Sequence, residues 1–74
     1  GDAVVEFPYL IFEQEPRAGE HIRIWREQED RFSFEHLMPT GKGITIPCST
    51  LSEALSLWES LKAKIVLEER TAKA

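Results

Sequence analysis

Cysteine is nearly missing from this chain of 74 residues, which contains only Cys48. A single cysteine excludes an internal disulfide and every metal site that needs several thiolates. It also makes a reducing, cytoplasmic location the default expectation. The sequence has no apolar run close to the roughly 20 residues that a membrane helix needs. We therefore expect one small soluble domain over residues 1–74, with no membrane contact and no signal peptide.

Positive charge is also scarce, because nine lysines and arginines stand against 13 acids and give a formal net charge of −4 at pH 7. Residues 1–30 carry eight acids and three arginines, a balance of −5, whereas residues 31–74 carry five acids and six bases, a balance of +1. This distribution argues against strong, sequence-independent binding to duplex DNA, since neutralised phosphates supply most of that affinity. It leaves room for a local basic strip, because the position of charges sets the field at a groove.

Hydrophobic patterning predicts four short strands before residue 50. We expect strands at residues 4–13, 21–26, 32–38 and 44–46, separated by turns at residues 15–20, 28–31 and 39–43. Pro8 should place the first strand at a sheet edge or break it, and Pro47 should stop the fourth. Alternation along the second strand puts Ile22 and Ile24 on one face, and His21, Arg23 and Trp25 on the other.

The last third of the sequence changes to a helical period. Thr50 and Glu53 have the spacing of a capping box, with Thr50 as the N-cap. Apolar residues then recur at helical spacing as far as Leu67, and they make a stripe wider than one small sheet can cover. We expect residues 68–74, like residues 1–3, to fray. The predicted fold class is α+β: a four-stranded antiparallel meander followed by one C-terminal helix, ββββα.

Catalytic and metal-binding chemistry has little support in the sequence. His21 and His36 lie on neighbouring predicted strands, and a zinc site would need a third ligand from Glu35 or Cys48. Histidines in a small sheet are more often surface or partly packed side chains, so we expect no metal and no cofactor. The chain contains no HExxH, no GxSxG and no Ser-His-Asp order. We therefore expect no catalytic residue and no enzymatic activity.

Two further features each have a functional and a structural interpretation. Cys48 directly precedes the predicted helix, where a thiol pKa is lowered, but a small apolar residue packed under the helix is the commoner role. Gly41-Lys42-Gly43 lacks the spacing and the terminal Lys-Ser/Thr of a nucleotide-binding loop. It fits a hairpin turn whose lysine makes one contact with a nucleic-acid phosphate.

Cations and an aromatic side chain gather around the second predicted strand. Arg23 and Trp25 share a face, and two more arginines lie near the end of that strand. Open sheets that combine stacking aromatics with cations are typical of proteins that bind single-stranded nucleic acid. We predict a non-enzymatic module that binds single-stranded DNA or RNA, with further stacking by Tyr9 or Phe34. The predicted contact residues are Arg23, Trp25, Arg26, Arg31, Lys42 and Gly43.

Two segments carry a family resemblance. Residues 22–27 read Ile-Arg-Ile-Trp-Arg-Glu, and residues 39–46 read Pro-Thr-Gly-Lys-Gly-Ile-Thr-Ile, ahead of a helix with Trp58 and Leu61. This layout resembles the single-stranded-DNA-binding transcriptional coactivator family typified by positive cofactor four, with Pur- and Whirly-type relatives. The resemblance covers residues 5–66 and implies a role in transcription regulation, with a homodimer whose helices pack together. The dimer interface is then expected at Leu57, Trp58, Leu61, Ile65 and Val66.

The acidic first half and the apolar helix edge support an alternative function. The chain is then a protein–protein interaction module, such as an adaptor, an inhibitor or a small subunit of a complex, and its acidic surface meets a basic partner. Both interpretations need a sheet face that the helix leaves uncovered. They differ in the charge of that face, and a continuous negative face favours the protein partner.

Overall fold

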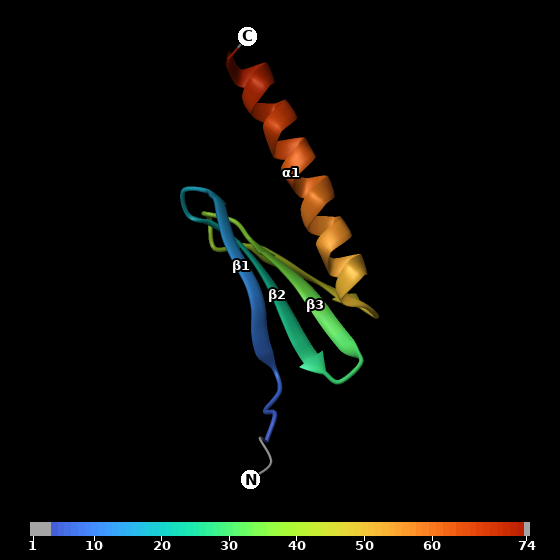
Figure 1. The fold of residues 1–74 in the computed structure, drawn as a ribbon. Helices are drawn as coiled ribbons and strands as arrows, with labels where there is room; N and C mark the ends of the chain where they lie inside the picture. Colours follow the sequence, from blue (N-terminus) through green and yellow to red (C-terminus); the bar gives the residue numbers. More distant parts are fainter. Residues whose placement is uncertain (1–3, 74) are drawn as a thin grey trace.

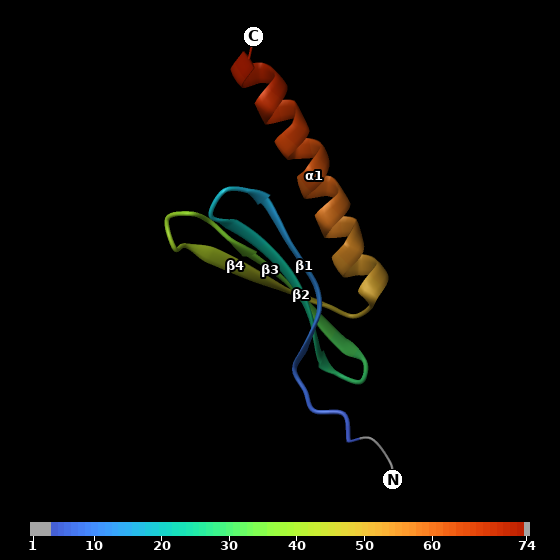
Figure 2. The ribbon, with the colours of Figure 1, turned by 60° about the vertical axis from the view of Figure 1, so that its left-hand side comes forward.

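The computed structural model describes residues 4–73 and confirms the predicted ββββα arrangement. Its elements are β1 (Tyr9–Arg17), β2 (Glu20–Gln28), β3 (Arg31–Leu37), β4 (Gly43–Cys48) and α1 (Leu51–Lys73). The four strands form one antiparallel sheet in the order β1-β2-β3-β4. Helix α1 lies against one side of the sheet, and its C-terminal end projects past the strands (Figures 1 and 2). The predicted fraying of residues 1–3 concerns a part of the chain outside the described residues.

Prolines mark both edges of the sheet. Pro8 precedes β1, and Pro16 lies within β1 where the register shifts between Gln14 and Arg17. Pro47 lies within β4, opposite Ser33. An edge strand tolerates proline because a missing N–H on its outer side breaks no ladder bond. The edge position of the first strand is therefore confirmed, whereas the prediction that Pro47 ends the fourth strand is wrong.

The first predicted turn is tighter in the structure than the sequence suggested. Strand β1 continues to Arg17, so only Ala18 and Gly19 connect it to β2. Gly19 adopts a φ of 81°, a left-handed conformation that glycine reaches without steric cost. The predicted turn over residues 15–20 was too wide because Pro16 does not end β1. An edge strand tolerates a proline whose missing N–H would face away from the sheet.

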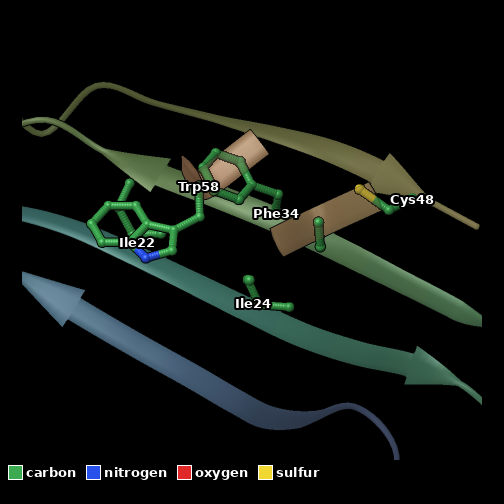
Figure 3. Packing of buried hydrophobic residues seen from close by; sticks show 6 residues of the cluster. Ile22, Ile24, Phe34, Cys48 and Trp58 are labelled. Atoms are coloured by element: carbon green, nitrogen blue, oxygen red, sulfur yellow. The ribbon is translucent and has the colours of Figure 1, made fainter. Parts of the chain in front are cut away.

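Alternation along β2 and β3 decides which side chains enter the core. Ile22 and Ile24 are completely buried on the α1 side, and Phe34 lies opposite Ile24. Together with Cys48, Ala54 and Trp58 they form the buried cluster between sheet and helix (Figure 3). A side chain of this kind contributes about 1.5–3 kcal/mol when it is fully buried. His21, Arg23 and Trp25 occupy the opposite face, as the alternation predicted.

The start of α1 is capped as predicted, but its end lies further along the chain. Thr50 Oγ1 accepts the N–H of Glu53 at 3.1 Å, and the Glu53 carboxylate accepts the N–H of Ser49 at 3.0 Å. The helix then continues to Lys73, so residues 68–73, which we expected to fray, are part of α1. The segment contains no glycine or proline, and it is rich in alanine, glutamate, lysine and arginine, which favour helix.

Replacement of Trp58 tests the packing of α1. The Trp58 ring is 8% exposed and its centroid lies 5.9 Å from that of Phe12. We expect Trp58→Ala to lower the free energy of unfolding by about 3–5 kcal/mol in a urea titration, because it leaves a cavity between helix and sheet. Glu69→Ala is the control and should change stability by less than about 0.5 kcal/mol, since Glu69 is an exposed residue of α1. Equal effects of the two substitutions would contradict this packing.

Candidate functional site

The uncovered face of the sheet is built from alternate positions of the four strands. Cross-strand register arranges these positions in three rows. The rows are Leu10, Trp25, Ser33 and Pro47; then Glu13, Arg23, Glu35 and Thr45; then His21, Leu37 and Gly43. Glu15 extends the third row, because its carboxylate lies 4.0 Å from His21 Nε2. The face is therefore mixed, because the row that contains Leu10 and Trp25 (the apolar row) lies beside the row that contains Glu13 and Arg23 (the charged row).

Arg23 lies at the centre of this face and is held between two carboxylates. Its Nε donates to Glu13 from β1, and its Nη1 lies 3.5 Å from Glu35 Oε1 on β3. The hydrogen bond to Glu13 is the main reason that the pKa of Arg23 is raised, with a smaller contribution from Glu35. The positive charge of Arg23 is thus already balanced within the protein.

Trp25 is fixed by the same charged row. Its indole Nε1 donates to Glu35 Oε1 at 3.3 Å. The ring is half-buried and pairs across the sheet with Leu10, whose side chain is 42% exposed. This arrangement presents a small apolar surface next to carboxylates, which suits a ligand with both apolar and cationic groups.

The other predicted cations do not lie beside Arg23. Arg26 belongs to the opposite side of the sheet, where it lies over the Phe32 ring and donates to the Tyr9 hydroxyl and the carbonyl of Glu29. The hydrogen bond to Tyr9 chiefly raises the pKa of Arg26. Arg31 begins β3 at one end of the sheet.

Lys42, between β3 and β4, and Gly43, the first residue of β4, lie at the other end of the sheet. Phe34 is 3% exposed beneath α1, so it cannot stack on a base, whereas Tyr9 is 36% exposed. Within the described residues, the predicted contact residues therefore do not form one basic strip.

The charge of the uncovered face is negative. Four glutamates and Asp30 belong to it, against the cations Arg23 and Arg31, which gives −3 with His21 neutral. These glutamates are Glu13, Glu15, Glu27 and Glu35. Such a surplus attracts cationic groups and repels phosphates.

The predicted dimer residues divide into packed and exposed side chains. Trp58 and Ile65 are buried within the protomer, and Leu57 and Leu61 are half-buried against its own core. Val66 is 48% exposed, and its neighbour Leu67 is 65% exposed.

A buried ionic cluster, which the sequence did not reveal, joins the sheet to α1. Glu20 is 1% exposed, and its two carboxylate oxygens accept hydrogen bonds from Arg17 at 2.7 and 3.1 Å. His36 Nε2 lies 2.6 Å from Glu20, and Arg17 also donates to Glu68 of α1 at 2.9 Å. The hydrogen bond from Arg17 is the main cause that lowers the pKa of Glu20 to about 2.

Because Glu20 is an ionised acceptor, His36 Nε2 must be the donor. The sequence held one signal of this burial. Glu20 lies two residues before Ile22 in the same strand, and residues two apart in a strand face the same side, here the core.

The remaining candidate chemical groups are separated in space. His21 and His36 project from opposite faces of the sheet, so the approach considered for a metal site does not occur. Residues 4–73 hold no group of three or more histidine, cysteine, aspartate or glutamate side chains placed to bind a metal ion. Cys48 is 6% exposed, and burial, helped by Glu53, raises the pKa of its thiol. This environment matches the interpretation of Cys48 as a packed apolar residue.

No helix within the described part of the chain is both long and apolar enough to cross a membrane. Comparison with protein-family models, with curated proteins and with solved structures found no match to this chain. The resemblance to the coactivator family therefore stays a prediction.

The buried cluster makes stability depend on pH through Glu20. Its folded-state pKa lies below the ordinary value of 4.5, so ionised Glu20 stabilises the fold above that pH, and this contribution is lost as the pH falls towards about 2. We expect Glu20→Gln to cost about 3 kcal/mol at neutral pH, because it removes one partner from a buried charged network. Urea titrations from neutral pH to pH 2 should find that the wild type and the variant converge in acid. A constant difference across this range would contradict the assignment.

Proposed function

We propose that this chain is a non-enzymatic protein-interaction module that binds a positively charged partner protein through its uncovered sheet face. The observation that carries the proposal is the position of Arg23 between Glu13 and Glu35, at the centre of a face with a charge of −3. The central cation is satisfied internally, so the face offers carboxylate acceptors to a ligand. Complementary charge of this kind sets the choice of partner and the rate of association.

The apolar row gives such an interface its anchor. Trp25 and Leu10 lie side by side, and Glu35 holds the Trp25 indole. Tryptophan is enriched among the residues that carry most of the energy of protein interfaces, whereas surrounding charges mainly steer the encounter. The chain would act as an adaptor, an inhibitor or a small subunit of a larger complex.

Single-stranded nucleic acid remains the competing ligand. The uncovered antiparallel face and the partly exposed Trp25 ring favour it, because bases stack on aromatic side chains. The surplus of carboxylates opposes it, because phosphates approach such a face against its field. The protein partner is therefore the better supported of the two ligands.

Removal of two carboxylates separates these ligands. In Glu13→Gln/Glu35→Gln the shape of the face is kept and Arg23 loses its charged partners. We expect this variant to bind a short arginine-lysine peptide about tenfold more weakly than the wild type in isothermal titration calorimetry, which corresponds to about 1.4 kcal/mol.

The matched control is Glu69→Gln, because Glu69 is an exposed residue of α1. It should bind the peptide as the wild type does. No binding of the peptide by the wild type, together with binding of oligo-dT at low salt that the double substitution strengthens, would overturn the proposal in favour of nucleic acid.

We also propose that the chain forms a homodimer through the exposed end of α1. Support comes from Val66 and Leu67, which are adjacent, 48% and 65% exposed, and near the end of a helix that projects past the sheet (Figure 1). A small chain gains stability when such apolar surface is covered by a second copy. Leu57 and Leu61 would border this contact.

Analytical ultracentrifugation tests the dimer. The wild type should sediment as a dimer at micromolar concentration, and Val66→Glu/Leu67→Glu should sediment as a folded monomer, because two charges replace the apolar contact. Substitution of the exposed Glu69 by Gln is the control and should leave the dimer intact. A monomeric wild type at every concentration would remove the proposal.

A further inference from the structure

A hollow lies at one end of the uncovered face, where β2 turns into β3 and β4 leads into α1. Its volume is about 950 Å³, and side chains that line it include Glu27, Asp30, Arg31, Ser33, Thr45 and Ser49. Hollows of this size, roughly 300–1,000 Å³, are where proteins commonly bind ligands. Ser33 and Pro47 belong both to the hollow and to the apolar row of Trp25. A ligand seated there is therefore continuous with the rest of the face.

The walls of the hollow carry more negative than positive charge. Glu27 and Asp30 contribute two carboxylates, and Arg31 contributes one guanidinium. Ser33, which is 4% exposed, donates its hydroxyl to one oxygen of Glu27 at 2.8 Å and so orients that carboxylate. The bond uses one of the two oxygens, and the hydroxyls of Thr45 and Ser49 add further acceptors.

We propose that this hollow seats an extended, lysine- and arginine-rich segment of the partner protein, with Glu27 and Asp30 as the residues that select its cationic side chains. The proposal rests on the proposed function and adds the place and the chemistry of the anchoring contact. From the hollow, the segment continues past Ser33 to Trp25. There its apolar and cationic side chains contact the indole ring and the neighbouring Glu35 carboxylate.

Charge complementarity selects this occupant over the alternatives. A second copy of the chain carries a formal charge of −4 and would meet the acidic face with like charge. A nucleic-acid strand would place its phosphates against Glu27, Asp30 and the three other glutamates of the face. A basic peptide meets the carboxylates of Glu27 and Asp30 in the hollow and that of Glu35 beside Trp25.

Charge substitutions of opposite sign within the hollow give the test. Glu27→Gln/Asp30→Asn keeps the shapes of the side chains and removes two negative charges, so we expect about tenfold weaker binding of a short arginine-lysine peptide by isothermal titration calorimetry. Arg31→Gln removes the competing cation and should tighten binding about threefold. Glu69→Gln should leave the affinity unchanged, and thermal unfolding should confirm that each variant is folded.

The outcomes separate the inference from the proposed function. If the wild type binds the peptide, and Glu13→Gln/Glu35→Gln weakens it but the hollow variants do not, the hollow is not the anchor and the function stands. If the wild type does not bind the peptide at all, the proposed function itself fails. If oligo-dT binds and Arg31→Gln weakens that binding, the hollow receives a nucleic-acid strand and the inference is overturned.

Discussion

The burial of Ile22, Ile24 and Phe34 beneath Trp58 is the constraint on which the rest of this structure depends. Side chains of a strand alternate between the two faces of the sheet. Because Ile22 and Ile24 face the helix, their neighbours Arg23 and Trp25 must lie on the other face. A slip of one residue would exchange the two sets and expose the core. The composition of the uncovered face is therefore a consequence of how the core packs.

Much of this fold follows from local patterns in the sequence. Period-two alternation in residues 21–26, the cap at Thr50 and the apolar helical spacing up to Ile65 each predict an element that the structure contains. The misplaced boundaries depend on tertiary context. Pro47 stays in β4 because that strand is an edge, and α1 continues past Leu67 through a segment of good helix formers that ties to the sheet through Glu68 and Arg17.

The candidate site is harder to predict from the sequence than the fold is, because the charge of the uncovered face depends on how neighbouring strands are aligned. Alternation correctly placed Arg23 and Trp25 together, but it gave no sign that Glu13 and Glu35 lie on either side of Arg23. That contact joins three strands, so it is fixed by bulges and turns rather than by spacing along one strand. Arg26 was grouped with Arg23 by nearness in sequence, and the same alternation places it on the opposite face.

The two tryptophans provide the most direct measurement of the central claim, that the uncovered face receives a cationic protein segment. Trp25 lies on that face and Trp58 lies in the core on the other side, so their indole N–H signals report on opposite faces of one sheet. In a ¹H–¹⁵N correlation titration with the arginine-lysine peptide, we expect the Trp25 indole signal to move and saturate while that of Trp58 stays in place. Movement of Trp58 alone, or of neither signal, would contradict it.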